Sequence, residues 1–257
     1  MSLEILIIIL AGWGAGIVTG LVGASAVVLV APILITFLGY DPYIAIGISL
    51  ATDIIASSVS AFTYHRNGNL KLKEGLYLAL ASVTAAIIGS WLSSFLSPSL
   101  LGGSTGIVIL FMGISFLRKP LNQRLKEFQN KFDLSFWKDK KIFSAIFFGG
   151  LIGLMTGFFG AGGGMMILMV LTFIYGFSVH AAIGTSVLIM TFNALFGATS
   201  HFLVDQHIPF MEITVSGFGG LIGAVMAAVY ANAISEKKLS KAVGVVFIVL
   251  GIISVIR

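Results

Sequence analysis

Hydropathy, internal repetition and glycine placement predict an all-α polytopic membrane protein. We expect two inverted repeats of about five apolar segments each, with short or broken helices at glycine-rich motifs. The 257 residues are 58% hydrophobic and 10% charged, and their mean hydropathy is +1.06. Soluble domains carry about 25% charged residues. The composition therefore indicates an integral membrane protein.

A set of four glycines near the N-terminus recurs 137 residues later with the same spacing. The two sets are Gly12, Gly16, Gly20 and Gly23, and Gly149, Gly153, Gly157 and Gly160. The match continues downstream, because residues 45–47 and 182–184 are both Ala-Ile-Gly. Internal duplication of this kind is common in membrane transporters, whose substrate site lies between the repeats.

Ten apolar segments follow from the hydropathy pattern, five in each half. Most reach the roughly 17 to 25 residues that a spanning helix needs, but the second segment of each half is shorter. The first segment has Glu4 and no basic residue before its apolar run, so we expect it to be a membrane segment and not a cleaved signal. The segments are 3–22, 24–38, 43–63, 75–96, 100–117, 142–159, 164–175, 180–203, 209–233 and 239–256.

Basic residues concentrate in one connector, since eight of the fifteen Lys and Arg lie between 118 and 141. The positive-inside rule places this connector in the cytoplasm, and counting spans from it places both termini outside. We expect a first transmembrane repeat at 1–117, a basic and partly amphipathic cytoplasmic connector at 118–141, and a second transmembrane repeat at 142–257. The expected location is the cell (inner) membrane, crossed several times. Equivalent connectors differ in charge, which favours inverted repeats.

The net charge of +5 comes from these loops, so we attribute it to membrane orientation and not to nucleic-acid binding. The chain has no cysteine, and neither a paired-histidine metal motif nor a hydrolytic triad is recognisable in it. We therefore expect no enzyme activity, no cofactor and no metal. The expected partners are the lipid bilayer and a small anion, with protons and a second copy of the chain in a homodimer as further candidates.

The junction between the first and second apolar segments of each half is rich in glycine. Four of the five residues 160–164 are glycine, a composition that does not hold a regular helix. Irregular backbone at membrane depth occurs where protein or a water-filled cavity covers it, and the helix that follows would point free N–H groups at that cavity. We predict an anion site there, with close helix packing as the alternative. Its predicted residues are Gly23, Gly160, Gly162, Gly163 and Gly164, with the hydroxyls of Thr19, Ser25, Ser49, Thr156 and Ser186.

Asp53 stands near the centre of the segment 43–63. Ten residues of helix place it about 15 Å into a hydrocarbon layer of about 30 Å. An ionisable residue at that depth is a functional candidate by default, so we predict that Asp53 couples or gates transport. The alternative is a hydrogen-bonded structural aspartic acid. Met190 occupies the equivalent position in the second half, so the duplication alone does not require an acid there.

These features together resemble the TauE/SafE sulfite exporter family. The resemblance is carried by the glycine-rich string 160–164 with Gly184-Thr185-Ser186, and by the weaker 16–26 with Gly47-Ile48-Ser49. It implies movement of sulfur-containing anions and adds Thr185 to the predicted site. We therefore expect a secondary transporter that exports a small anion, sulfite or an organosulfonate, by alternating access. An anion channel or a carrier of another small solute is the alternative.

Overall fold

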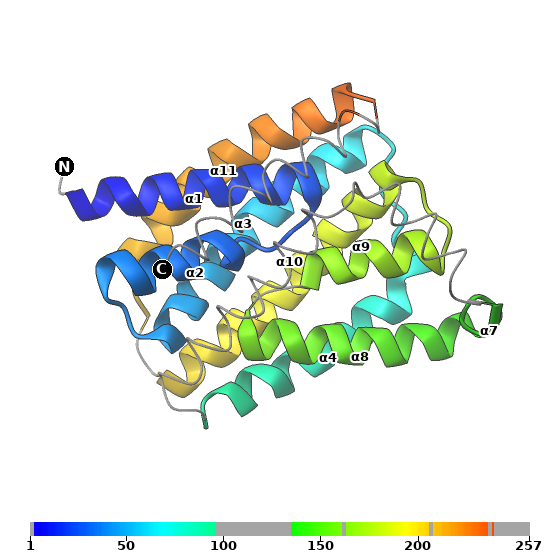
Figure 1. Ribbon diagram of the computed structural model, residues 1–257, viewed down its shortest axis with the longest axis horizontal. Helices are drawn as coiled ribbons and strands as arrows, with labels where there is room; N and C mark the ends of the chain where they lie inside the picture. The colour runs from blue at the N-terminus through cyan, green and yellow to red at the C-terminus, as the bar shows by residue number, and fades with distance from the viewer. Residues whose placement is uncertain (1–2, 96–134, 161–162, 206–207, 236–237, 239–257) are drawn as a thin grey trace.

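The computed structural model of the protein describes residues 3–95, 135–160, 163–205, 208–235 and 238. Within these residues, all regular secondary structure is helical (Figure 1). The helices are α1 (Leu3–Val22), α2 (Val27–Leu38), α3 (Pro42–Arg66), α4 (Leu72–Ser93), α7 (Ser135–Asp139), α8 (Lys141–Phe159), α9 (Gly163–Phe173), α10 (Val179–Asp205) and α11 (Phe210–Ala233).

Six helices of the described part are long and apolar enough to cross a membrane, namely α1, α3, α4, α8, α10 and α11. Two others, α2 and α9, are apolar but have only 12 and 11 residues. The predictions of an all-α polytopic protein and of short helices after the glycine-rich motifs are therefore confirmed. The expected segments 100–117 and 239–256 lie outside the described residues, as does most of the connector 118–141.

The glycine ladders lie where helices from different halves of the chain touch. In α1, a Cβ added to Gly12 or Gly16 would overlap the backbone of α11, at the carbonyls of Ser216 and Gly220. In α8, a Cβ on Gly153 would overlap a backbone carbonyl of α4. Glycine at such positions allows two backbones to approach closely in lipid. As a result α1 lies beside α11, and α8 lies beside α4, at opposite edges of the molecule (Figure 1).

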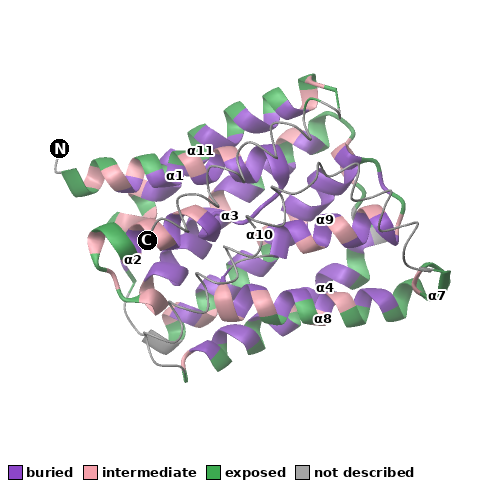
Figure 2. Ribbon diagram, in the orientation of Figure 1, coloured by how far each residue is buried: buried purple, intermediate pink, exposed green. Residues whose placement is uncertain are grey.

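The centre of the molecule is formed by α3 and α10, which run antiparallel. At one end the rings of Tyr43 and His201 lie 4.2 Å apart, and at the other end Tyr64 lies against Gly184. These two helices are the most enclosed of the spanning helices. In the most apolar stretch of each, 72% of the residues are buried, whereas the corresponding value for α8 is 39%. Buried residues accordingly dominate the middle of Figure 2, where α2 and α9 also lie.

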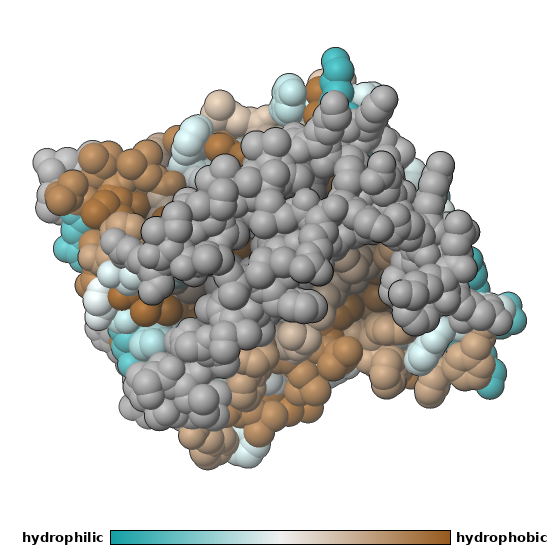
Figure 3. All heavy atoms as spheres, viewed as in Figure 1, coloured by the Kyte–Doolittle hydropathy of each residue, from teal (hydrophilic) through white to brown (hydrophobic). Residues whose placement is uncertain are grey.

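The outer helices present large apolar side chains to the surroundings. Leu10 of α1, Leu80 of α4, Ile146 of α8 and Val229 of α11 are all more than half exposed. In water such exposure would be costly, but in a bilayer it matches the hydrocarbon. The hydrophobic surface over the N-terminal part of α1 is visible at the left of Figure 3. The outer helices therefore form a lipid-facing shell around α3 and α10.

Candidate functional site

Each long first helix is followed by a glycine in the left-handed backbone region. Helix α1 ends at Val22 and Gly23 has φ 67°, while α8 ends at Phe159 and Gly160 also has φ 67°. Glycine adopts this conformation without the penalty that a Cβ brings. The chain then turns, and the short helices α2 and α9 begin a few residues later. The helix breaks predicted at the glycine-rich motifs are therefore present in both halves.

The two breaks meet in space, although they are 137 residues apart in sequence. Ser25 Oγ lies 3.1 Å from the carbonyl oxygen of Gly160. A Cβ on Gly164 would overlap the carbonyl of Gly23, and a Cβ on Gly23 would lie 2.7 Å from Ser186 Oγ. All five residues are buried. The glycines therefore allow backbone and small polar groups of both halves to share one enclosed region.

The carboxyl group of Asp53 lies at the N-terminus of α2. The backbone N–H of Ala26 donates to Asp53 Oδ1 at 3.1 Å, and Ser25 Oγ lies 2.7 Å from Oδ2. Ala26 is the N-cap residue of α2. Because the N-terminus of a helix carries partial positive charge and unpaired N–H groups, it favours a negatively charged partner. The side chain of Asp53 therefore supplies the hydrogen-bond acceptor at this helix end.

The second half differs at this point. Met190 replaces Asp53 at the equivalent position, and Gly163 replaces Ala26. The methionine lies against the start of α9. A Cβ added to Gly164 would be 2.7 Å from Met190 Sδ. The N-terminus of α9 therefore faces a thioether where that of α2 faces a carboxyl group.

Three of the predicted hydroxyl groups lie at the breaks. Thr19 donates to the carbonyl of Ala24 at 2.9 Å, within the first break, and its hydroxyl also faces Asp53. Thr156 donates to the carbonyl of Ile152, one turn earlier in α8, and its side chain lies directly against Gly163. Together with Ser25, these hydroxyls are buried and surround the Gly23 and Gly160 turns.

The other predicted hydroxyls are spread along α3 and α10. Ser186 donates to the carbonyl of Ile183 at 2.9 Å and faces Gly23, as described above. Ser49 donates to its own helix, to the carbonyl of Ala45 at 2.6 Å. Thr185 accepts the backbone N–H of Lys71 at 3.0 Å, so its hydroxyl ties α10 to the start of α4 and not to the breaks. The predicted residue Gly162 lies outside the described residues.

Sequence reasoning missed one pair of residues that supports the breaks. The phenol of Tyr64 donates to the carbonyl of Gly20 at 3.1 Å, in the last turn of α1. The Nε2 of His201 lies 3.2 Å from the carbonyl of Gly157, in the last turn of α8, and must carry the proton there because a carbonyl only accepts. Tyr64 and His201 are equivalent by the offset of 137, and so are their acceptors Gly20 and Gly157. That offset is the signal that could have revealed them.

A separate polar cluster links α1, α11 and the turn between α2 and α3. The hydroxyl of Tyr40 lies 3.0 Å from a carboxylate oxygen of Glu4 and 2.9 Å from one of Glu212. Partial burial, followed by the neighbouring Glu212 and Glu4, raises the pKa of Tyr40 above its ordinary value. The phenol therefore stays protonated and can donate to either carboxylate. This cluster lies at the starts of α1 and α11, away from the breaks.

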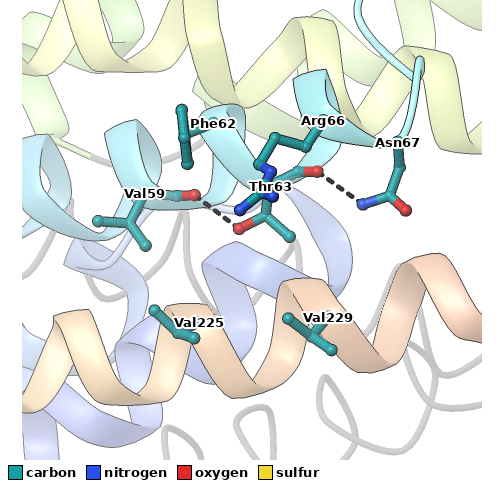
Figure 4. A pocket seen from close by; sticks show the side chains of 7 residues that line it. All are labelled: Val59, Phe62, Thr63, Arg66, Asn67, Val225 and Val229. Atoms are coloured by element: carbon teal, nitrogen blue, oxygen red, sulfur yellow. Dashed lines mark hydrogen bonds between the residues drawn. The ribbon is translucent and has the colours of Figure 1, made fainter.

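A groove of about 510 Å³ runs between α3 and α11, apart from the candidate site (Figure 4). Its walls are mostly apolar and face outward, with Phe62 60% and Val229 55% exposed. The guanidinium of Arg66 lies 5.9 Å from the centre of the Phe62 ring at one end of the groove. The residues that line it are Val59, Phe62, Thr63, Arg66, Asn67, Val225 and Val229.

In the part of the chain that the structure describes, six apolar spanning helices and two buried helix breaks define a multi-pass helical membrane protein. The model of the family described as Sulfite exporter TauE/SafE matches residues 8–253. The chain therefore belongs to the TauE/SafE family of membrane transporters.

Curated relatives agree with this membership. A protein of Bacillus subtilis named Probable membrane transporter protein YunE is 24% identical over 88% of this chain and 89% of its own length. A Probable membrane transporter protein of Xylella fastidiosa (strain 9a5c) is 28% identical over 98% of this chain and 95% of its own. The archaeal protein MJ0441 of Methanocaldococcus jannaschii, also named a probable membrane transporter, is 24% identical over 76% of this chain and 71% of its own. No solved structure matches the chain significantly.

Proposed function

We propose that this protein is a secondary transporter that exports a small anion, sulfite or an organosulfonate, by alternating access. The observation that carries the proposal is the carboxyl group of Asp53 on the N-terminus of α2, through Ala26 N–H and Ser25 Oγ. At the equivalent position beside α9 stands Met190, which brings no charge. We propose that the transported anion takes at α9 the place that Asp53 takes at α2.

The chemistry of this helix end suits an oxyanion. The first N–H groups of a helix have no partner within it, and together they present partial positive charge at a single point. Gly163 and Gly164 add no side chain of their own at this helix end, where the Thr156 hydroxyl lies against Gly163 and the Met190 thioether against Gly164. Sulfite and sulfonate groups carry several acceptor oxygens. Such a group is held without any lysine or arginine, which keeps the charge of the empty site low.

Release to the outside is favoured by the membrane potential. A negative interior drives an anion outward by about 2.3 kcal/mol per charge per 100 mV. This term supports export of any anion that crosses with a net negative charge. The family description, which names sulfite export, agrees with this direction.

We also propose that the halves are inverted repeats and that the basic connector is cytoplasmic. Support comes from α3 and α10, which are equivalent by the offset of 137 and run antiparallel. Helices related by an in-plane two-fold axis have opposite directions in this way. The same offset relates α1 to α8 and α11 to α4. The symmetry therefore converts the pair of α1 and α11 into the pair of α8 and α4. Alternating access would then be a rocking of the two halves about the breaks.

Asp53 is proposed to couple or gate this movement. Its carboxyl group is fully buried, and it lies beside the region that we assign to the anion. An ionised Asp53 would repel a bound anion, whereas a protonated Asp53 would not. The anion and a proton would therefore occupy the cavity together, and transport would depend on pH.

Flux into liposomes that contain the purified protein tests the proposal. We expect saturable and electrogenic transport of sulfite or sulfoacetate, with sulfate and acetate as comparison anions. Saturation together with faster uptake of labelled anion when unlabelled anion is present inside, measured at zero membrane potential, distinguishes a carrier from a channel. Transport of none of these anions, at a protein density that gives normal reconstitution, would contradict the proposed function.

A further inference from the structure

Ser25 links the carboxyl group of one half to the backbone of the other. Its Oγ lies 2.7 Å from Asp53 Oδ2 and 3.1 Å from the carbonyl oxygen of Gly160, and it accepts the backbone N–H of Val27 at 3.3 Å. A serine hydroxyl has only one proton to donate. With an ionised Asp53, two acceptors therefore compete for that proton.

The protonation state of Asp53 decides this competition. A carboxylate is the stronger acceptor, so an ionised Asp53 takes the Ser25 proton and Gly160 loses it. A protonated Asp53 instead donates its own proton to Ser25 Oγ, which leaves the serine proton free for the Gly160 carbonyl. The same three groups therefore form a bond between the two breaks in one state and lack it in the other.

We propose that Ser25 is a positioning residue that converts protonation of Asp53 into a hydrogen bond holding the two helix breaks together. The protonated state closes the contact between the first break and Gly160, and loss of the proton releases it. The inference rests on the proposed function for its role in transport, since it names how the coupling proton acts on the anion site. The bond itself depends only on the geometry.

The asymmetry between the halves supports this assignment. At the positions equivalent to Ser25 and Asp53, the second half has Gly162 and Met190, so it has neither the hydroxyl nor the acid. Both members of the pair therefore occur together in the first half and are both absent from the second. A purely structural cap for a short helix would be needed equally in α2 and α9.

No other titratable group with a described side chain bonds to Asp53. Helix α2 carries none. Most groups on the neighbouring helices bond elsewhere: Tyr64 and His201 to the carbonyls of Gly20 and Gly157, His180 to the carbonyl of Ala231, and Glu4 and Glu212 to Tyr40. Tyr230 of α11 is more than half exposed on the outer surface. His65 and Arg66 lie in the last turn of α3, more than ten residues beyond Asp53. Tyr43 lies ten residues before Asp53, against His201. Asp205 is the last residue of α10.

Amide hydrogen exchange in the second break tests the inference without any substrate. The readout is exchange at Gly160, Gly163 and Gly164 in the reconstituted protein from about pH 5 to about pH 9, corrected for the intrinsic pH dependence of exchange. In the wild type we expect exchange to be about fivefold slower at the acid end, the size of effect that one added hydrogen bond gives.

Two variants should remove the pH dependence with opposite results. Ser25→Ala has no hydroxyl to share, so exchange should be fast at every pH. Asp53→Asn has an amide that always donates to Ser25, so exchange should be slow at every pH. Ser25→Thr should restore the wild-type profile. The matched control is Ser57→Ala, which removes the hydroxyl bonded to the Asp53 backbone carbonyl at 2.5 Å and should leave the profile unchanged.

The inference is overturned if Ser25→Ala keeps the wild-type pH profile, or if Asp53→Asn exchanges as fast as Ser25→Ala. Failure of anion flux with this exchange pattern intact would contradict the proposed function alone. Normal anion flux without the pattern would contradict the role of Ser25 alone. Thermal unfolding of each variant shows that it is folded before exchange is compared.

Discussion

Asp53 accepts the backbone N–H of Ala26 at 3.1 Å, which places a buried carboxyl group on the N-terminus of α2. The contact joins the middle of the spanning helix α3 to the start of the short helix α2, between residues 27 positions apart in the chain. The helix break in the first half therefore has a carboxyl oxygen bonded to its backbone N–H. In the second half the same place is held by Met190, where the protein supplies no carboxylate of its own.

Asp53→Asn should keep anion transport and remove its dependence on pH. The amide retains the shape of the side chain and one acceptor oxygen for Ala26 N–H, but it does not titrate. We expect an apparent KM within about twofold of the wild type and a flux that no longer changes with pH. Flux at a series of pH values in liposomes measures this. A wild-type pH profile in the variant would make Asp53 a structural residue.

Gly153→Ala should destabilise the protein, because its methyl group would overlap the carbonyl of Ser82 in α4. Forcing an extra carbon into a packed contact costs about 1 to 3 kcal/mol. Gly150→Ala, three residues earlier on the same helix, is the matched control, since a Cβ there meets no atom within 4 Å. Thermal unfolding in detergent should show a lower Tm for Gly153→Ala only. Equal Tm values would mean that α8 does not pack on α4 through this glycine.

Tyr40 should make stability fall at alkaline pH. Its pKa is raised by burial and by Glu212 and Glu4, so the folded protein holds the phenol proton at pH values where the unfolded chain has lost it. The stabilisation is complete below the ordinary tyrosine pKa of about 10 and is lost as the pH rises further. Because water screens this open cluster, we expect less than about 1 kcal/mol.

Tyr40→Phe removes that titration. Unfolding measured between about pH 9 and about pH 11 should therefore decline less steeply in the variant than in the wild type. At neutral pH the variant should be slightly less stable, because the carboxylates of Glu4 and Glu212 lose their shared donor. Identical pH slopes in the two proteins would show that the cluster does not form.

Single cysteines can test the proposed orientation, since the chain has none of its own. Lys73 and Phe210 are exposed, lie near the starts of α4 and α11, and are equivalent by the offset of 137. In intact cells a membrane-impermeant thiol reagent should label Phe210→Cys and spare Lys73→Cys until the membrane is opened. Labelling of both from outside would contradict inverted repeats.

The helices and their breaks could be predicted from the sequence because they depend on local signals. The apolar runs and the glycine spacing are visible in one dimension, and the breaks fall where glycines concentrate. The pairing of α1 with α11 could not be predicted, since any small-residue face suits another. The partners of Asp53 were missed for the same reason: nothing in the sequence says which helix start lies beside a buried acid. Thr185 shares a motif with Ser186, but successive residues on a helix point in different directions.

A carboxylate introduced at the N-terminus of α9 tests the central claim most directly. Met190→Glu would place a negative charge where we propose the anion binds, and Met190→Gln is the neutral control of almost the same size. Liposome flux and apparent KM are measured for both variants, after thermal unfolding has shown that each is folded. The account predicts that Met190→Glu loses saturable anion flux and that Met190→Gln retains it. Equal flux in the two variants would contradict an anion site at the start of α9.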